Sequence, residues 1–286
     1  MGLFDTVLLT VDYDRTLTGP DSTIPQRNLD AIRYFMENGG AFTVNTGRSL
    51  PMTRFFPENL EVNAPLLLYN GSLAYDLKTK QVLNPAIIQL DQAATIRRVM
   101  ELLPDMAVEM QGLESHYLFA KKSGWDGATY GNSSTWTPAQ PEDDLGPFIK
   151  FAVYGYLHSN TVAALYEGTA EEFARFDEAE QILLREFGDH CEVFRAAPKI
   201  LDVHAKGVSK AKAARMLQKY LGREILVCAG DGENDLSMMH DADFAFAPQD
   251  AIIAKQFPNV CPCGEGAVAD VIYEKIPEIL KIRLDK

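Results

Sequence analysis

Two short acidic runs near opposite ends of the chain carry the residues best suited to chemistry. They are residues 11–16 (VDYDRT) and residues 230–235 (GDGEND). Each follows an apolar stretch that is typical of a buried strand. If the fold brings the two loops together, Asp12, Asp14 and Asp231 converge as an oxygen-rich site of the kind that binds Mg²⁺. Because these carboxylates would repel one another without a cation, we predict a magnesium-dependent reaction at an activated aspartate.

Two further polar segments are predicted to lie at the same edge of the fold. In an open parallel sheet, ligands collect beyond the carboxyl ends of the strands. Residues 46–48 (TGR) and the segment around Lys210 are both expected at such ends, as are the two acidic runs. A single carboxylate after a strand commonly caps a helix or faces solvent. Four polar segments in register with one crevice indicate a functional site instead.

The first third of the chain alternates strand and helix signals. We expect strands over residues 5–12, 41–44 and 65–69. Between the first two strands, residues 23–26 (TIPQ) predict a helix start with a threonine cap and a proline in the first turn, and the glycines at 39–40 end that helix. Strand–helix–strand order at this spacing implies parallel pairing with right-handed crossovers.

The middle of the chain changes to a pattern in which strands follow one another. Helices are expected over residues 90–103, capped by Asp91, and over roughly 176–187. Strand-like runs are expected near residues 106–110, 115–120, 148–157 and 191–203. Successive strands with few helices indicate an α+β module with an antiparallel sheet. Residues 121–147 form a long irregular segment, and long loops of this kind are often functional.

The alternating rhythm returns in the last third. Ser209 caps a predicted helix that Gly222 closes, and strands are predicted over residues 225–229 and 244–247. We therefore predict an α/β fold, with a doubly wound, Rossmann-like parallel-sheet core made from both ends of the chain and an inserted α+β cap. The core would comprise residues 1–83 and 199–286, and the cap, which would set substrate specificity, residues 84–198.

These motifs resemble those of the haloacid dehalogenase superfamily, in the Cof-type phosphatase subgroup with a large C2 (type IIB) α/β cap. The resemblance rests on five segments in order, namely residues 12–16 (DYDRT), 46–48 (TGR), 70–71 (NG), 207–210 (GVSK) and 230–235 (GDGEND). Their order and spacing match over nearly the whole core, whereas the cap matches only in size and position. The resemblance implies a phosphoryl-transfer enzyme that uses Mg²⁺.

The resemblance implies separate roles for the acidic residues. Asp12 would be the nucleophile that forms an aspartyl-phosphate, and Asp14 would be the general acid and base. Mg²⁺ would be held by Asp12, by the backbone carbonyl of Asp14 and by Asp231. Asp235 would act on the metal through water or support the ligands from behind.

The same resemblance implies a set of residues that bind the phosphate group. Thr46 and the Gly47 amide would hold phosphate oxygens, and Lys210 would pair with both the nucleophile and the phosphate. A lysine at a helix start lies at the unfavourable end of the helix dipole, so an anionic partner explains Lys210 better than solvent does. Asn234 would reach the phosphate or fix Lys210, and Arg48 is a candidate substrate contact.

Arg15 departs from the family pattern, in which glycine is usual at this position. An arginine would clash within a tight loop unless its backbone conformation is ordinary. Two orientations are open: the side chain points to solvent, or it projects toward the cap and adds a cation to the entrance.

Composition narrows the class of protein. The net charge of −13 argues against nucleic acid or an anionic membrane as the main partner. A protein this acidic must supply positive charge locally if it handles phosphate. No apolar run approaches the roughly 20 residues that span a bilayer, and we expect a cytoplasmic protein. The four cysteines form no disulfide framework, and the close pair Cys261 and Cys263 lacks the partners of a zinc site.

We expect a phosphatase that acts on a small phosphorylated metabolite, with a sugar phosphate as the leading candidate. A phosphosugar mutase shares these motifs and this cap type, and it is the nearest alternative. A non-catalytic sensor of phosphorylated ligands is a third, which the intact set of charged site residues disfavours. Five cap residues are candidates for lining the substrate pocket: Lys121, Lys122, Trp125, Tyr130 and Trp136.

Overall fold

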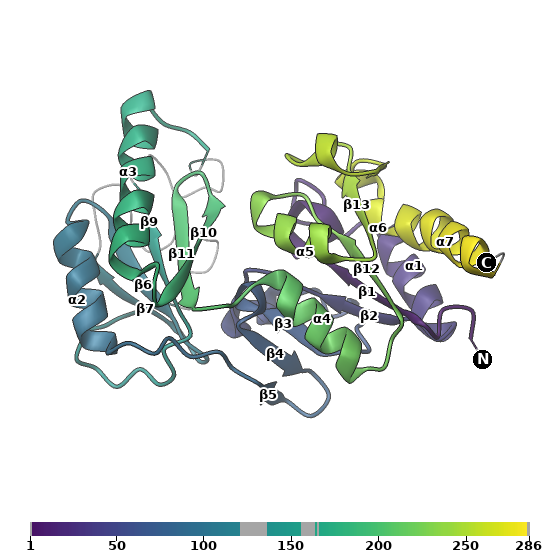
Figure 1. Ribbon diagram of the computed structural model, residues 1–286, viewed down its shortest axis with the longest axis horizontal. Helices are drawn as coiled ribbons and strands as arrows, with labels where there is room; N and C mark the ends of the chain where they lie inside the picture. Colours follow the sequence, from purple (N-terminus) through teal and green to yellow (C-terminus); the bar gives the residue numbers. More distant parts are fainter. Residues whose placement is uncertain (1, 121–135, 156–163, 165, 285–286) are drawn as a thin grey trace. The chain divides into compact units, whose positions relative to one another are not determined.

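The computed structural model describes residues 2–120, 136–155, 164 and 166–284, and the chain divides into two compact units (Figure 1). The first unit comprises Met1–Gly47, Phe56–Asn84 and Ser209–Lys286. The second comprises Arg48–Phe55 and Pro85–Val208. The second unit runs past residue 198, where we placed the end of the cap, because the strand Ile200–Ala205 pairs within its sheet.

A parallel sheet forms the centre of the first unit. Its described strands are, in spatial order, β14 (Asn259–Val260), β13 (Phe244–Pro248), β12 (Ile225–Ala229), β1 (Val7–Val11) and β2 (Ala41–Val44). Every residue of β1, β2 and β12 is buried, as expected for parallel strands with both faces covered. The register pairs Val11 with both Ala229 and Val44, so the segments that follow these strands leave the sheet at one edge.

Two groups of helices pack on this sheet, as the predicted doubly wound core requires (Figure 1). Helix α1 (Gln26–Glu37) contacts β2 and α6 (Ala267–Asp270). Helix α4 (Lys210–Tyr220) contacts β12 and α5 (Leu236–Asp241). The last helix, α7 (Ile276–Leu284), lies at the C-terminal end of the chain.

The start of α1 differs from the prediction. Its first residue, Gln26, follows Pro25, which provides no side-chain cap. The Thr23 hydroxyl instead donates to Asp21 Oδ1 (2.8 Å). The predicted threonine cap is therefore wrong, because Thr23 lies three residues before the first residue of the helix, where its hydroxyl contacts Asp21 instead of the helix amides. The helix ends as predicted, with Gly39 in the left-handed region at a φ of 94°.

A small antiparallel sheet adjoins the parallel one. Strand β3 (Leu66–Leu68) is joined to the end of β2 by a parallel bridge between Asn45 and Leu67. It also pairs with β4 (Leu73–Asp76), which pairs in turn with β5 (Gln81–Leu83). We predicted β3 but not the hairpin of β4 and β5, because strands of four and three residues are too short to show a clear alternation of polar and apolar side chains.

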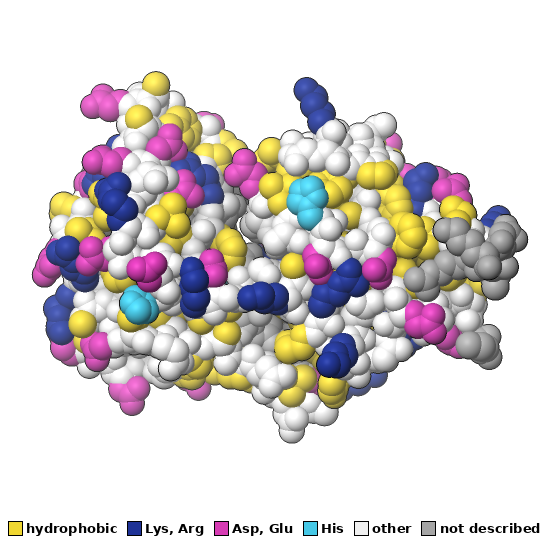
Figure 2. Space-filling view, in the orientation of Figure 1, with side chains coloured by type: hydrophobic (Ala, Val, Ile, Leu, Met, Phe, Trp, Pro, Cys, Tyr) yellow, Lys and Arg dark blue, Asp and Glu magenta, His cyan; other side chains and the backbone are white. Residues whose placement is uncertain are grey.

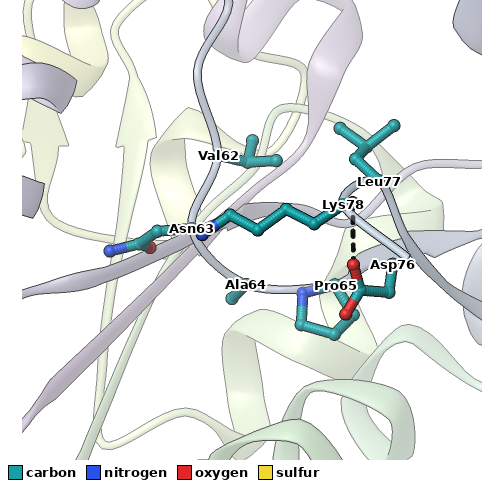
Figure 3. A pocket seen from close by; sticks show the side chains of 7 residues that line it. All are labelled: Val62, Asn63, Ala64, Pro65, Asp76, Leu77 and Lys78. Atoms are coloured by element: carbon teal, nitrogen blue, oxygen red, sulfur yellow. Dashed lines mark hydrogen bonds between the residues drawn. The ribbon is translucent and has the colours of Figure 1, made fainter. Parts of the chain in front are cut away.

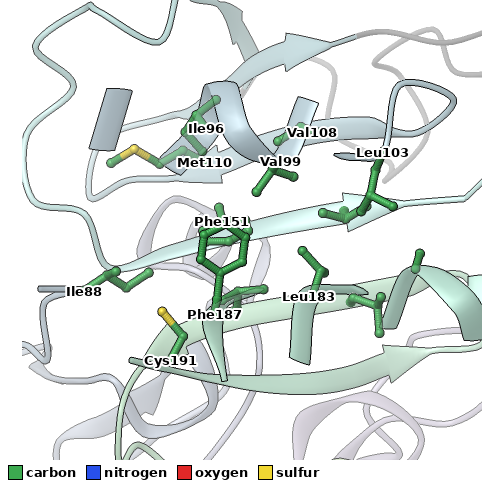
Figure 4. Close-up of a cluster of buried hydrophobic side chains, with 14 of the residues drawn as sticks. Ile88, Ile96, Val99, Leu103, Val108, Met110, Phe151, Leu183, Phe187 and Cys191 are labelled. Atoms are coloured by element: carbon green, nitrogen blue, oxygen red, sulfur yellow. The ribbon is translucent and has the colours of Figure 1, made fainter. Parts of the chain in front are cut away.

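The second unit is an antiparallel sheet packed against two helices (Figure 4). Its strands are, in spatial order, β10 (Cys191–Ala197), β11 (Ile200–Ala205), β9 (Lys150–Tyr154), β6 (Ala107–Gln111), β7 (His116–Ala120) and β8 (Trp136–Pro138). The last pair, β7 and β8, is parallel, and the other neighbours are antiparallel. Val108, Met110 and Phe151 form a buried core with α2 (Gln92–Leu102) and α3 (Ala170–Phe187). The predicted α+β unit is confirmed.

Side-chain caps start both helices of the second unit. Asp91 Oδ1 accepts a hydrogen bond from the Ala94 amide (2.7 Å), as predicted. Helix α3 begins earlier than predicted, at Ala170, because Thr169 and Glu172 form a reciprocal capping box.

The surface carries charges of both signs. On the face drawn in Figure 2, Lys and Arg side chains are interspersed with Asp and Glu side chains. Exposed ion pairs contribute to this pattern, with N–O distances of 2.7 Å for both Arg98–Glu186 and Arg175–Asp105. None of the described helices combines the length and the apolar character that a membrane-spanning segment needs.

Candidate active site

The ends of three parallel strands position the first site residues. Asp12 directly follows β1, and its backbone N–H donates to the carbonyl of Ala229, the last residue of β12 (2.9 Å). Asp231 lies two residues beyond β12. Strand β2 is in register with β1, which brings Thr46 to the same edge. Residues far apart in the sequence thus meet where the strand pairing ends.

Lys210 is the buried cation of this site and the first residue of α4. The hydroxyl of Ser209 caps the helix by accepting from the Lys212 amide (3.2 Å). The Lys210 Nζ lies 2.6 Å from Asp12 Oδ1 and 2.5 Å from Asp235 Oδ1. Burial disfavours the charged ammonium, but the two carboxylates outweigh it and raise the pKa of Lys210 above its ordinary value. Lys210 therefore stays charged between them.

Asp235 has both carboxylate oxygens engaged. Its Oδ1 accepts from Lys210, and its Oδ2 accepts from the backbone amides of Asp231 and Gly232 (3.0 Å each). These bonds hold the turn after β12 in shape. Asp235 thus orients both the lysine and the loop that carries Asp231.

The carboxylates form a cluster with the properties of a metal site. Asp12, Asp231 and Asp235 each offer an oxygen, and these three atoms lie within 4.8 Å of one another. Burial, opposed by Lys210 and supported by Asp235, raises the pKa of Asp12 to about 7. Burial, followed by the charges of Asp12 and Asp235, raises the pKa of Asp231 to about 8. One lysine leaves such a cluster short of positive charge, and its oxygen ligands fit a hard divalent cation such as Mg²⁺.

Gly47 and two asparagines, Asn70 and Asn234, form a second group at the same edge. A Cβ built at Gly47 would lie 3.0 Å from Asn70 Oδ1, so a larger residue there would press on the Asn70 amide. Asn234 Nδ2 donates to the same oxygen (3.4 Å). The Asn70 backbone, which has a φ of 54°, donates its N–H to Thr46 O (2.9 Å). The loops after β2, β3 and β12 are thereby linked.

Asp14, Arg48 and the candidate pocket residues complete the predicted site residues. Asp14 is exposed on the loop after β1, close enough to Asp12 for its charge to act on that carboxyl. Arg48 belongs to the second unit. The candidate pocket residues Lys121, Lys122, Trp125 and Tyr130, and the side chain of Trp136, lie outside the part of the chain that the structure describes.

Arg15 takes a backbone conformation that is unusual for its type. Its φ of 59° and ψ of 12° place it in the left-handed region, where glycine is favoured. The side chain is 47% exposed, in keeping with the solvent-facing alternative. Its Nε also lies 3.9 Å from Asp231 Oδ2, a contact that neither predicted orientation includes.

Two residues that support the site were not singled out from the sequence. Asn45 is buried and donates through Nδ2 to the Lys210 carbonyl (3.0 Å), tying the end of β2 to the first turn of α4. The Thr16 hydroxyl donates to Asp231 Oδ1 (3.3 Å). A polar residue at the end of an apolar strand was the available signal for Asn45, and Thr16 was quoted only as part of its motif.

A separate hollow in the first unit lacks this chemistry (Figure 3). It is lined by Val62, Asn63, Ala64, Pro65, Asp76, Leu77 and Lys78. Its one carboxylate, on Asp76, accepts from the backbone amides of Lys78 and Thr79 (2.8 and 3.0 Å). These bonds are those of a turn, so the hollow is not a candidate for catalysis.

A family model described as haloacid dehalogenase-like hydrolase matches residues 9–254. The chain belongs to this family. It is 22% identical over 284 residues to the pyridoxal phosphate phosphatase YbhA of Escherichia coli (strain K12), covering 95% of this chain and 99% of that protein. It is 23% identical over 253 residues to the 5-amino-6-(5-phospho-D-ribitylamino)uracil phosphatase YcsE of Bacillus subtilis (strain 168), covering 85% and 84%.

The solved structures agree in fold with this haloacid dehalogenase-like hydrolase. The HAD subclass IIB sugar phosphatase BT4131 superposes with a TM-score of 0.75 at 19% identity, over 96% of this chain and 100% of that one. A haloacid dehalogenase-like hydrolase from Bacteroides thetaiotaomicron has the same TM-score at 20% identity, over 94% and 98%. The family membership, the capped α/β fold and the expectation of a phosphatase are therefore confirmed.

Proposed function

We propose that this phosphatase is Mg²⁺-dependent and hydrolyses a small sugar phosphate through an aspartyl-phosphate on Asp12. The observation that carries the proposal is the arrangement around Asp12. A fully buried lysine lies 2.6 Å from its Oδ1, and oxygens of Asp12, Asp231 and Asp235 lie within 4.8 Å of one another. An anionic nucleophile can approach an anionic phosphate only where positive charge offsets their repulsion.

The metal would be held by side chains that the structure groups together. Asp12 and Asp231 would be direct ligands, with the backbone carbonyl of Asp14 as a third. Asp235 would support the ligands or bind the metal through water, because Lys210 and two backbone amides already engage its oxygens. When bound, Mg²⁺ neutralises charge on the phosphoryl oxygens during transfer.

In the first step, a carboxylate oxygen of Asp12 attacks phosphorus, and the bond from phosphorus to the ester oxygen breaks. Asp14, in its protonated form, gives its proton to that leaving oxygen. The substrate departs as an alcohol, and the phosphoryl group stays on Asp12. An exposed position suits Asp14 for this exchange, since its proton must be replaced later.

In the second step, the Asp14 carboxylate takes a proton from a water molecule as the water oxygen attacks phosphorus. The bond between phosphorus and Asp12 breaks, which releases inorganic phosphate and restores both carboxyl groups. Lys210 balances the charge on Asp12 at each stage, because its ammonium is held against that carboxylate. Thr46, the Gly47 amide and Asn234 would hold the phosphoryl oxygens.

The choice of a small phosphorylated substrate draws on relatives as well as chemistry. Proteins similar to this chain are named as phosphatases of pyridoxal phosphate, of a phosphoribitylamino-uracil and of sugar phosphates. All three substrates are small phosphate monoesters. A sugar phosphate is the proposal that we carry into experiment, and Arg48 is its candidate contact outside the metal cluster.

The nucleophile is tested by Asp12→Asn with para-nitrophenyl phosphate as substrate. We expect a loss of at least about 1,000-fold in kcat, because an amide oxygen cannot form the aspartyl-phosphate. Asp30→Asn, an exposed substitution on α1, is the matched control and should keep wild-type activity. Removal of metal with EDTA should abolish turnover, and added Mg²⁺ should restore it. Normal turnover by Asp12→Asn, or turnover that survives EDTA, would contradict the scheme.

The substrate is tested by phosphate release across sugar phosphates, nucleotides and cofactor phosphates. We expect the highest kcat/KM for a sugar phosphate, with one inorganic phosphate released for each substrate consumed. Transfer to a second sugar without phosphate release, or a need for a sugar bisphosphate, would establish the mutase instead. Preference for a nucleotide or cofactor phosphate would leave the mechanism intact and overturn the sugar.

A further inference from the structure

Arg15 is held in its left-handed conformation by the loop around it. Its backbone N–H donates to Thr18 Oγ1 (3.2 Å). The next bonds of the loop run from the Leu17 amide to Asp12 O (3.2 Å) and from the Thr18 amide to Tyr13 O (3.0 Å). An L-residue with a long side chain is disfavoured at positive φ, and such outliers persist where the surroundings impose them. The unfavourable backbone conformation of Arg15 therefore indicates that its side chain has a role in the site.

The Arg15 side chain reaches the carboxylate that Lys210 does not pair with directly. Lys210 contacts Asp12 and Asp235, whereas Arg15 Nε lies 3.9 Å from Asp231 Oδ2. Among the described residues, Arg15 is the basic side chain with a nitrogen within ion-pair distance of Asp231. Two cations are thus distributed over three clustered carboxylates.

Arg15 and Asp231 differ in exposure, and this difference lets a divalent cation replace the guanidinium beside Asp231. The Asp231 side chain is only 11% exposed, so its charge is costly without a nearby cation. The Arg15 side chain is 47% exposed, so its guanidinium is partly hydrated and has solvent available when the pair opens. A divalent cation that binds Asp231 would meet the guanidinium at short range and repel it.

We propose that Arg15 is a tethered counter-ion for Asp231, which neutralises the empty metal site and competes with the divalent cation for that carboxylate. Arg15 thereby sets the metal affinity of the site and holds the loop after β1 against the loop after β12 when no metal is bound. This inference rests on the proposed function only in taking Asp231 as a metal ligand. Arg15 is a positioning residue and is not assigned a part in bond making.

The test is Mg²⁺ binding to the full-length protein by isothermal titration calorimetry at pH 9, where the Asp231 carboxyl, whose pKa is raised to about 8, is ionised before metal is added. Arg15→Asn removes the charge but tolerates positive φ, and Arg15→Lys keeps the charge. We expect Arg15→Asn to bind Mg²⁺ about tenfold more tightly at low ionic strength, and Arg15→Lys to bind like the wild type. Salt screens exposed charges, so the difference should shrink to less than about threefold in 0.5 M KCl. A merely structural role would show no such salt dependence.

Thermal unfolding supplies a second measurement that is independent of activity. Loss of the counter-ion should lower the Tm of metal-free Arg15→Asn and leave the Tm in saturating Mg²⁺ at the wild-type value. Arg15→Gly is a second neutral variant in case Arg15→Asn folds poorly. Its relief of backbone strain adds equally to the Tm in both states, so the Tm gained on adding Mg²⁺ should still exceed that of the wild type. Arg33→Gln, at an exposed position on α1, is the control for removal of an arginine.

The outcomes separate this inference from the proposed function. An Mg²⁺ affinity that is unchanged or weaker in both Arg15→Asn and Arg15→Gly overturns the role of Arg15, provided that Asp231→Asn abolishes binding. Mg²⁺ binding that survives Asp231→Asn, or a wild type that binds no Mg²⁺, overturns the metal assignment and the Arg15 proposal together.

Discussion

At the residue scale, the site is a buried cluster in which the carboxylates outnumber the cations beside them. The Lys210 side chain contacts two of the clustered carboxylates, Asp12 and Asp235. Removing one partner from a buried ion pair leaves an uncompensated charge, which costs more than the pair itself contributes. The lysine therefore matters to the stability of the fold as well as to its proposed role in phosphate binding.

We expect Lys210→Met to lower the free energy of unfolding by about 3–5 kcal/mol and to reduce kcat by at least about 100-fold. Lys212→Met, two residues along the same helix at an exposed position, is the matched control and should change stability by less than about 0.5 kcal/mol. Urea unfolding and steady-state kinetics measure both effects. Equal stabilities for the two variants would contradict the buried-pair interpretation.

Stability should also depend on pH through the same cluster. The pKa values of Asp12 and Asp231 are raised from 3.8 to about 7 and about 8 in the metal-free fold. A carboxyl group with a raised pKa takes up a proton on folding, so its stabilising contribution is complete below about pH 4 and is lost as the pH rises through 7 to 8. We expect the free energy of unfolding in EDTA to fall between pH 5 and pH 8.5.

Protons compete with metal at these oxygens, so Mg²⁺ should stabilise the protein more at pH 8 than at pH 5.5. Urea unfolding in EDTA and in excess Mg²⁺ measures both slopes. Asp231→Asn removes one of the two titrations and should flatten the EDTA profile. The same slope in this variant and the wild type would show that other groups govern the pH dependence.

At the element scale, the N-terminus of α4 is the support on which Lys210 depends. Ser209 caps this helix, and Asn45 binds the Lys210 carbonyl from the end of β2. A lost cap costs about 1 kcal/mol and frays the first helical turn, which here carries Lys210. The first turn of α3 has an equivalent cap at Thr169, but no proposed site residue.

We expect Ser209→Ala to cost about 1 kcal/mol of stability and to lower kcat about 3- to 10-fold, because the first helical turn, which carries Lys210, loses its cap and frays. Thr169→Ala should cost a similar free energy and leave kcat within about twofold of the wild type. Unfolding curves and para-nitrophenyl phosphate kinetics compare the two. Matching effects on kcat would mean that loss of stability, and not position, explains the Ser209 variant.

At the scale of the whole molecule, each of the two units has a hydrophobic core of its own. One surrounds α4 and α5 in the first unit, and the other lies under α2 and α3 in the second (Figure 4). Both tryptophans, at positions 125 and 136, fall within the sequence range of the second unit. We expect tryptophan fluorescence to report on the unfolding of that unit.

We expect Leu183→Ala to lower the stability of the second unit by about 2–5 kcal/mol, since it leaves a cavity at a fully buried position. The fluorescence midpoint in urea should shift, while the Mg²⁺ affinity of the first unit stays within about twofold of the wild type. Leu217→Ala, in the core of the first unit, is the counterpart and should leave the fluorescence midpoint in place. If both variants move that midpoint equally, the two units unfold as one.

Local pattern in the chain was enough to predict much of the fold. Apolar runs and turn residues predicted β1, β2 and β12, and Ser209 predicted the start of α4, because burial and capping depend on neighbours in sequence. The same reasoning failed at Thr23, which lies too far before Gln26 to cap α1, and at the short strands β4 and β5. The motif spacing also predicted that the two acidic loops lie at one edge of the sheet.

Which atoms meet at that edge depended on the tertiary structure. Lys210 bridging Asp12 and Asp235, Asn45 holding the Lys210 carbonyl, and Arg15 reaching Asp231 join positions 25 to 216 residues apart. Here 216 is the difference 231 − 15, and 25 is 235 − 210. Contacts of this kind follow from strand register and loop conformation, which a residue's own neighbours do not determine. The two acidic loops could thus be paired from sequence, but their charge balance required the fold.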